Sequence, residues 1–262
     1  MRILITGAAR AIGEATCDEL TRRGHEVVGT ARDVSLLDGH DVALKLALDV
    51  GDAGSVADAL AQAGALDAVV NNAGILGKGP LEDYPLDRLA NVLDTNAIGP
   101  LRVVQPLLSS WRERGSGVIV NVSSVQGRVS SPLEGAYAAS KFALEALSEA
   151  LHFELGHFGI RTVIIEPGYI APGMKAQGRH EGPEVYAELY RQWEGTDDAV
   201  TGPAGRPGPD LVARAIADAI EDPATPLRVP VGDDANMILA VRKELDDAAF
   251  EAAMRETIGL TW

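Results

Sequence analysis

Short apolar runs alternate with helix-length segments along this 262-residue chain, and that alternation limits the possible fold more than any other feature. The runs are rich in Val, Ile and Leu, which is typical of strands buried on both faces. Because a helical segment follows each run, successive strands are expected to lie parallel, with helices on both faces of the sheet. The sequence therefore predicts an α/β fold with a doubly wound parallel sheet. The predicted strands span 2–6, 25–30, 42–48, 68–71, 118–122, 161–166 and 227–231.

The remaining segments indicate a single domain over residues 1–262, because no Ser/Gly tract or charge block divides the chain. Glycine and proline become frequent after Gly168, which predicts a mobile substrate lid at about 169–208 with an amphipathic helix inside it. A C-terminal helix is expected at about 235–256. The other predicted helices span 11–23, 53–63, 87–113, 136–157 and, within the lid, 183–194.

Composition and charge exclude several classes of function. A formal net charge of −15 disfavours nucleic acid and anionic membrane as partners, since both are polyanions. The single cysteine, Cys17, rules out an intrachain disulfide, and the histidines show no metal-site spacing, so no metal is expected. No apolar run approaches the ~18 residues of a membrane span, and no signal peptide is visible. A cytoplasmic protein is the expectation.

A glycine-rich turn follows the first apolar run directly, as Thr6-Gly-Ala-Ala-Arg-Ala-Ile-Gly13. It opens a helical pattern, so the first backbone N–H groups of that helix and the helix dipole can receive a pyrophosphate. This context of strand, turn and helix predicts a dinucleotide site of the Rossmann type. The turn residues expected to bind are Gly7, Arg10, Ala11, Ile12 and Gly13.

Tyr137 and Lys141 stand four residues apart in a predicted helix, so both side chains lie on one face. A nearby ammonium favours the phenolate and lowers the phenol pKa from its ordinary value of about 10. Tyr137 could then exchange a proton with an alcohol or a carbonyl oxygen. The spacing alone is a weak motif and requires support from other residues.

That support comes from several motifs in register. The glycine-rich turn, Asn71-Asn-Ala-Gly74, Asn96, Ser124, Tyr137-x-x-x-Lys141 and Pro167-Gly168 resemble, in order and spacing, the short-chain dehydrogenase/reductase family. The likeness covers residues 1 to about 230. It is greatest to the single-domain branch of hydroxysteroid and retinol dehydrogenase-like enzymes.

The resemblance implies an oxidoreductase that interconverts a carbonyl and an alcohol by hydride transfer. In that family Ser124 and Tyr137 would hold the carbonyl oxygen, and Tyr137 would act as general acid/base. Lys141 would tune the phenol and contact the nicotinamide ribose. Asn96 would hold a water that continues the proton path to solvent. The implied catalytic residues are Asn96, Ser124, Tyr137 and Lys141.

The expected cofactor is NADP(H), with NAD(H) as the alternative. Ala31 occupies the position where NAD sites carry an acidic residue, and Arg32 and Arg10 could grip a 2′-phosphate. Asp33 stays open as a partner for the ribose 2′-OH if the alignment shifts by one residue. The resemblance places further cofactor contacts at Asp49, Val50, Asn72, Ala73, Gly74, Tyr137, Lys141, Pro167, Gly168 and Ile170.

Two residues depart from the family pattern. Ala11 replaces a glycine where the backbone approaches the pyrophosphate most closely. Pro172 stands where a threonine often follows Pro-Gly, and it offers neither a hydroxyl nor an N–H. Both changes leave open how the cofactor seats.

The expected substrate is a mainly apolar ketone or secondary alcohol. Alternatives are a catalytically silent NADP-binding regulator, or an epimerase or dehydratase on the same fold. The family resemblance implies a homodimer or homotetramer through the helices at 87–113 and 136–157. The candidate substrate residues are Val125, Gln126, Tyr169, Met174, Tyr186, Tyr190 and Trp193, with Leu133 as a further wall residue.

Overall fold

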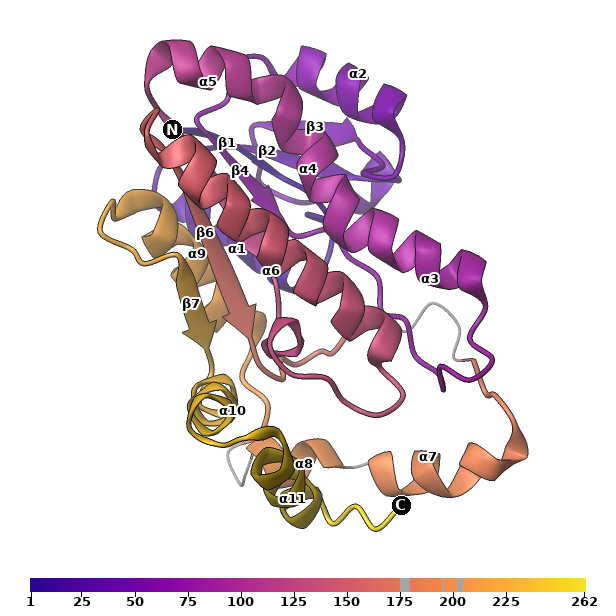
Figure 1. The fold of residues 1–262 in the computed structure, drawn as a ribbon. Helices are drawn as coiled ribbons and strands as arrows, with labels where there is room; N and C mark the ends of the chain where they lie inside the picture. Colours follow the sequence, from indigo (N-terminus) through magenta and orange to yellow (C-terminus); the bar gives the residue numbers. More distant parts are fainter. Residues whose placement is uncertain (175–179, 195, 202–204) are drawn as a thin grey trace.

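Among the residues described in the computed structural model, seven parallel strands form one sheet in the order β3-β2-β1-β4-β5-β6-β7 (Figure 1). The structure describes residues 1–174, 180–194, 196–201 and 205–262. The predicted doubly wound α/β fold is confirmed. The strands are β1 (Arg2–Ile5), β2 (Glu26–Ala31), β3 (Leu44–Ala47), β4 (Ala68–Asn71), β5 (Gly117–Val122), β6 (Ile160–Pro167) and β7 (Arg228–Val231).

Helices cover both faces of the sheet because alternate strand residues point to opposite sides. Ile3 and Ile5 of β1 pack in one core with α1 (Ala11–Arg22) and α9 (Pro209–Glu221). Leu4, between them, packs in the other core. That second core also contains residues of α2 (Ala53–Ala63), α4 (Gly99–Val104), α5 (Leu108–Arg114) and α6 (Gly135–Gly156).

The strand order reverses direction between β1 and β4. The chain leaves β1 toward β2 and β3 on one side, and then returns to β4 on the other side. In open parallel sheets, ligands bind at such a switch point, beyond the carboxyl ends of the strands. That edge faces α8 (Thr196–Thr201), α10 (Asp233–Glu244) and α11 (Asp247–Ile258), toward which the arrowheads of β6 and β7 point in Figure 1.

The helix predicted over 87–113 is a run of five helical segments. They are α3 (Leu86–Leu93), a π-helical turn η2 (Asp94–Ile98), α4, a 3₁₀ turn η3 (Gln105–Leu107) and α5. Pro100 and Pro106 explain the interruptions, since a proline has no N–H to donate to the carbonyl four residues earlier. Within η2, the Gly99 N–H donates to the Asp94 carbonyl, five residues back.

The C-terminal part differs from the prediction in two respects. α9 was not predicted at all, and the single helix expected over 235–256 is divided into α10 and α11. The division falls at Asp246, whose carboxylate accepts a hydrogen bond from the Ala249 N–H (2.9 Å) and caps α11. The helix expected at 183–194 is present as the 3₁₀ turn η5 (Glu184–Tyr186) followed by α7 (Ala187–Trp193).

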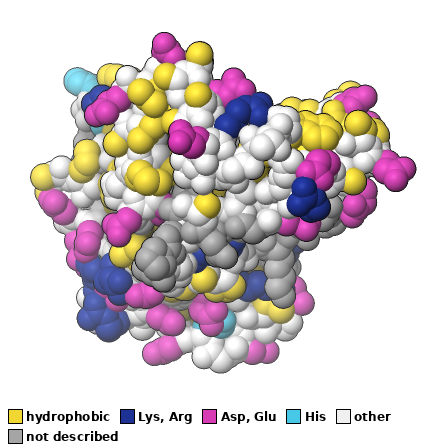
Figure 2. All heavy atoms as spheres, turned by 90° about the horizontal axis from the view of Figure 1, so that it is seen from below, with side chains coloured by type: hydrophobic (Ala, Val, Ile, Leu, Met, Phe, Trp, Pro, Cys, Tyr) yellow, Lys and Arg dark blue, Asp and Glu magenta, His cyan; other side chains and the backbone are white. Residues whose placement is uncertain are grey.

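Parts of the predicted lid at 169–208 lie outside the described residues, so its mobility stays a prediction. Figure 2 shows the molecule from below the view of Figure 1, with acidic side chains scattered over this face and basic ones gathered at a few places. Across the described ranges, no helix combines the length and apolar character needed to span a membrane.

Candidate active site

The glycine-rich turn lies at the carboxyl end of β1 and leads directly into α1. Arg10, at the N-cap of α1, makes no capping hydrogen bond with its side chain, and the Gly13 N–H donates to the Arg10 carbonyl (3.0 Å). The N–H groups of Ala11 and Ile12 are left for a ligand at the start of the helix. Gly7 has a φ of +66°, and a Cβ there would lie 2.9 Å from the Ala73 Cα. A Cβ on Gly13 would lie 2.7 Å from Asn72 Nδ2 and would overlap the Gly7 carbonyl. Glycine is therefore required at both positions for the turn to pack closely against the segment after β4.

Thr6 and Asn72 join this turn to the end of β4. The Thr6 hydroxyl accepts hydrogen bonds from the Asn72 and Ala73 N–H groups, each at 3.0 Å. The Asn72 side chain donates to the carbonyls of Thr6 (3.1 Å) and Gly7 (3.0 Å). Asn72 and Thr6 thus hold the turn against the end of β4. Thr6 was not among the expected cofactor contacts, although the motif begins with it.

Asn96 lies in η2 and is completely buried. Its side chain accepts from the Ile75 N–H (2.8 Å) and donates to the Ile75 carbonyl and to Ser140 Oγ (2.9 Å each). Because Pro100 has no N–H, the Asn96 carbonyl lacks the usual helical donor. π-helical turns of this kind recur at functional sites. The amide group therefore holds the segment after β4 against α6, and the water-holding role stays a proposal.

Ser124, Tyr137 and Lys141 converge where β5 meets the first turns of α6. Ser124 follows β5 as the N-cap of the 3₁₀ turn η4 (Val125–Gly127), where its Oγ accepts from the Gln126 N–H (3.1 Å). Ser124 is also near enough to the Tyr137 phenol to lower its pKa. Lys141 Nζ lies 5.7 Å from the centroid of the Tyr137 ring and donates to the Val122 carbonyl (2.7 Å). The structure thus brings the predicted proton-transfer residues together.

Burial dominates the electrostatics of this group. It raises the pKa of the Tyr137 phenol above its ordinary value, with a smaller rise from the Glu134 charge, while the Ser124 side chain opposes the rise. Burial also lowers the pKa of Lys141 to about 8, against the pull of Glu145 in the other direction. The sequence predicted that Lys141 would lower the Tyr137 pKa. In the structure the cost of burying a phenolate outweighs that effect.

The end of β2 carries the residues expected to choose the cofactor. Ala31 is buried, whereas Arg32 and Arg10 are exposed, and neither guanidinium forms an ion pair or hydrogen bond with the described part of the chain. Asp33 is occupied locally, because its Oδ1 accepts from Ser35 N (3.0 Å) and Ser35 Oγ (2.7 Å) and caps the 3₁₀ turn η1 (Val34–Leu37). These bonds lower the pKa of Asp33.

Asp49 and Val50, two of the expected cofactor contacts, follow β3. Asp49 Oδ1 accepts from the Gly51 N–H (2.9 Å), so the carboxylate shapes a turn, while the helix cap of α2 is Asp52. Val50 is buried, and its carbonyl accepts from the Arg102 guanidinium.

The turn after β6 is fixed by a residue that the sequence did not single out. Asp234, in the first turn of α10, accepts from the Tyr169 N–H (2.6 Å), and its carboxylate would overlap a Cβ at Gly168. Ile170 packs in the core beside α1 and α9. The Ala171–Pro172 peptide bond is cis, and the Ala171 N–H donates to the Pro207 carbonyl (2.9 Å).

The candidate substrate residues fall into two clusters and two separate positions. Val125 and Tyr169 pack with residues of α10 and α11, a contribution of the C-terminal helices that was not foreseen. Leu133, Tyr190 and Trp193 form a second cluster, against which Tyr186 packs. In a separate position, Gln126 donates to Glu134. The Tyr186 hydroxyl donates to Glu82 (2.7 Å), and the Met174 Cε lies 3.7 Å from where a Cβ on Gly74 would stand.

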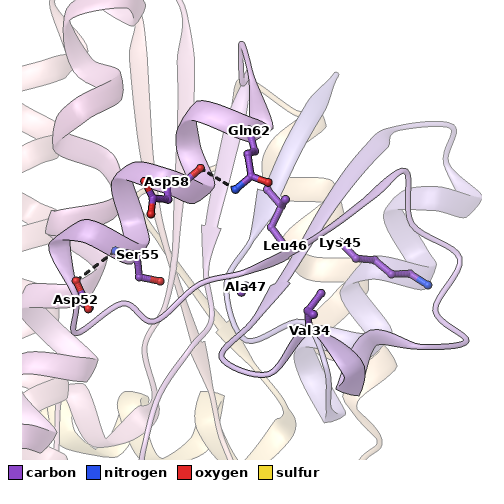
Figure 3. A pocket seen from close by; sticks show the side chains of 8 residues that line it. All are labelled: Val34, Lys45, Leu46, Ala47, Asp52, Ser55, Asp58 and Gln62. Carbon is purple, nitrogen blue, oxygen red and sulfur yellow. Dashed lines mark hydrogen bonds between the residues drawn. The ribbon is translucent and has the colours of Figure 1, made fainter.

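An open, polar groove of about 580 Å³ lies elsewhere, on the outer edge of the sheet between β3 and α2 (Figure 3). Its polar lining is partly committed to the fold, since Asp52 bonds to the Ser55 N–H (3.2 Å) and Gln62 to the Asp58 carbonyl (3.1 Å). None of the candidate catalytic or cofactor residues lines it. The lining residues are Val34, Lys45, Leu46, Ala47, Asp52, Ser55, Asp58 and Gln62.

Comparison with known proteins agrees with this geometry. The sequence model of the family described as short chain dehydrogenase matches residues 1–182. Retinol dehydrogenase 8 of Bos taurus is 34% identical over 254 residues, which cover 86% of this chain and 80% of that protein. The structure of a short-chain dehydrogenase from Streptomyces avermitilis is 35% identical, with a TM-score of 0.82, covering 100% of this chain and 99% of its own.

Two further structures are each 26% identical and contain a dinucleotide. The 3-ketoacyl-(acyl-carrier-protein) reductase of Brucella melitensis is complexed with NADH (TM-score 0.73, 89% of this chain and 98% of that chain). The gluconate 5-dehydrogenase of Burkholderia cenocepacia J2315 is in complex with NADP and tartrate (TM-score 0.72, covering 90% of this chain and 95% of that chain).

Fold, site and matches together define an oxidoreductase on a Rossmann-type fold. The chain belongs to the short-chain dehydrogenase/reductase family, which confirms the resemblance seen in its motifs. Its relatives include retinol dehydrogenase-like members.

Proposed function

We propose that this protein interconverts a carbonyl and an alcohol on a mainly apolar small molecule, using NADP(H), with Tyr137 as general acid/base. The observation that carries the proposal is the convergence of Ser124 and Tyr137 next to Lys141, at the carboxyl edge of the sheet. When bound, the dinucleotide supplies or accepts the hydride. Its pyrophosphate would lie on the glycine-rich turn at the start of α1.

The chain's own residues account for the proton. Ser124 and Tyr137 are placed to donate hydrogen bonds to a substrate oxygen and to stabilise the charge that develops on it. The raised pKa of Tyr137 keeps the phenol protonated at neutral pH, which is the form that can give a proton to an alkoxide. Lys141, with a pKa of about 8, is mostly an ammonium at pH 7 and favours the phenolate left behind. This state suits carbonyl reduction.

An apolar substrate is supported by the clusters that contain the candidate substrate residues. Val125 and Tyr169 join the C-terminal helices, and Leu133, Tyr190 and Trp193 form the second cluster. The name of the bovine relative, a retinol dehydrogenase, points to the same class of molecule. Apolar walls with few polar groups are typical of sites for such substrates.

A screen of NADPH oxidation over aldehydes, cyclic ketones, quinones and steroids tests the proposed reaction. With the best substrate, Tyr137→Phe should lower kcat/KM by about 10³-fold, because it removes the proton donor and little else. The variant should bind cofactor as the wild type does, which fluorescence titration would measure. A Tyr137→Phe enzyme with wild-type turnover would refute the mechanism.

The preference for NADP(H) is supported by the end of β2. Arg10 and Arg32 are both exposed there, and the carboxylate of Asp33 is held by Ser35. Arg32→Ala should raise the KM for NADPH about tenfold and leave the KM for NADH nearly unchanged, since one charge-assisted bond to the phosphate is lost. Arg22→Ala, an exposed change at the other end of α1, is the control. Faster turnover with NADH than with NADPH in the wild type would overturn the assignment.

We also propose that two copies associate through α6 and the adjoining helical run. Phe142 and Phe153 of α6 are 45% and 75% exposed, and Ile98 of η2 is 47% exposed. Phe142 and Phe153 are eleven residues apart, or about three helical turns, so they lie on one face. An exposed apolar face of this kind is typical of a protein interface.

A further inference from the structure

Lys141 carries its charge in the interior of the protein. The side chain is 5% exposed, and the ammonium donates to the Val122 carbonyl (2.7 Å). Burying an ammonium is costly unless an anion offsets the lost hydration. A negative charge near Lys141 is therefore expected.

Glu145 supplies a negative charge in the right place. It follows Lys141 by one helical turn on the same face of α6 and is 4% exposed. Its carboxylate is held by a residue of the sheet, since Oε2 accepts a hydrogen bond from Arg228 Nε of β7 (2.9 Å). The carboxylate thus has a fixed position in a buried site, and a fixed charge acts strongly at low dielectric.

Arg228, which holds Glu145, belongs to a larger cluster of charged side chains. Arg228 also bonds to Glu149 Oε2 (2.5 Å) on the exposed side of α6 and lies 4.0 Å from Glu166 Oε1 of β6. Arg128, after η4, lies 3.5 Å from the same Glu166 oxygen. The cluster therefore links α6, β6, β7 and the segment that follows Ser124.

One carboxylate oxygen of Glu145 is not engaged by the fold. Glu145 Oε1 and Ser123 Oγ are buried and have no hydrogen-bond partner among the described residues. Both lie beside Gly127, where a Cβ would stand 3.1 Å from Glu145 Oε1 and 2.7 Å from Ser123 Oγ. A buried polar atom without a partner calls for an explanation beyond packing.

We propose that Glu145 is a positioning residue for Lys141: held by Arg228, its carboxylate provides the counter-charge that keeps the lysine in its ammonium form, on the Val122 carbonyl. The inference rests on the proposed role of Lys141 in proton transfer. The direction in which Glu145 shifts the Lys141 pKa agrees with this role, because burial lowers that pKa to about 8 while Glu145 raises it. Glu166 is the other buried acid of the cluster, and burial and Glu145 raise its pKa to about 7. Arg228 and Arg128 oppose this rise in the Glu166 pKa.

Nuclear magnetic resonance of the protein with ¹³C-labelled lysine tests this directly. The chain has five lysines, and Lys141→Arg identifies the signal of Lys141. Glu145→Gln keeps an acceptor for Arg228 and removes the charge, so it should lower the Lys141 pKa by about one unit. Glu149→Gln is the matched control, because this residue bonds to the same Arg228 but is half-exposed, and it should leave the pKa unchanged. An unchanged Lys141 pKa in folded Glu145→Gln overturns the inference.

A second variant keeps the test decisive if Glu145→Gln does not fold. Arg228→Gln removes the partner that holds the Glu145 carboxylate in place, so it should lower the Lys141 pKa as Glu145→Gln does, and an unchanged pKa would count against the inference. Glu145→Asp, which retains the charge, should restore most of the wild-type value. In turnover, Glu145→Gln should shift the alkaline limb of the kcat/KM profile to lower pH by the same amount. The lysine titration needs neither substrate nor cofactor. A negative result for the role of Glu145 can therefore be distinguished from a negative result for the proposed reaction.

Discussion

Ala11 is a residue at which local conformation and side chain disagree. Its φ is +46°, and Leu133 is the other non-glycine residue in the described ranges with a left-handed φ. The left-handed region costs a residue with a Cβ about 1–2 kcal/mol, because the side chain crowds the following carbonyl. The sequence shows that a glycine is missing from the family pattern here. The strain itself depends on a backbone angle that no sequence pattern gives.

Ala11→Gly should therefore raise the free energy of unfolding by about 1 kcal/mol, after allowing for the greater flexibility of glycine in the unfolded chain. Denaturant titration in the absence of cofactor measures the change. Ala9→Gly is the matched control, since Ala9 lies in the same turn without a left-handed φ and should lose stability. If both variants lose stability, the strain at Ala11 is not relieved by glycine.

The site residues that the sequence missed have distant partners. Asp234 binds a backbone N–H 65 residues earlier, and Glu145 meets Arg228 83 residues later. Neither lies in a local motif, so only the fold reveals them. By contrast, Ser124, Tyr137 and Lys141 lie within 18 residues of one another, and a helix fixes the spacing of Tyr137 and Lys141. For this reason the proton-transfer residues could be predicted from the sequence, whereas Asp234 and Glu145, which contact the site from distant parts of the chain, could not.

Among the elements, all seven described strands were predicted to within two residues, because buried parallel strands leave continuous apolar runs. α9 was missed although Gly208 and Pro209 form a helix-start signal and Val212, Ile216 and Ile220 have helical spacing. The signal lies just after a stretch rich in glycine and proline, which favours an irregular interpretation. The division of α10 from α11 was missed because Asp246, the cap, stands in an acidic stretch where a capping role is not distinctive.

Glu166, at the end of β6, should make stability depend on pH. Its pKa is raised from 4.5 to about 7, so between these values the folded state holds a proton that the unfolded state has lost. The stabilising contribution is complete below pH 4.5 and is lost as pH rises through 7, in total about 3 kcal/mol. Glu166→Gln should therefore gain stability relative to the wild type from pH 5 to pH 8. Denaturant unfolding across this range measures the difference, and a gap that does not change with pH would contradict it.

The whole molecule has a formal net charge of −15, yet helix α6 leaves the large aromatic side chains of Phe142 and Phe153 exposed. Charge keeps copies apart at long range, so an interface between copies requires an apolar contact strong enough to overcome that repulsion. Salt screens the repulsion and should therefore favour association.

Phe153→Glu should shift the protein toward monomer, because it places a charge in the proposed interface between copies. Sedimentation velocity at several salt concentrations measures the change. Met237→Glu, at a similarly exposed apolar position on α10, serves as the control and should sediment as the wild type does. A wild type that is monomeric at all concentrations tested would dismiss the interface.

The packing of α1 against α9 determines how this chain can be divided. The family's sequence model ends at residue 182, before α9 and β7 begin. Arg23, just after α1, bonds to Asp218 (2.8 Å) and Glu221 (2.7 Å) of α9, and the apolar faces of both helices share one core. A fragment cut at residue 182 would expose that face of α1 and the edge of β6 to water and to other chains. The stretch that identifies the family is therefore shorter than the stretch that must be expressed for it to fold.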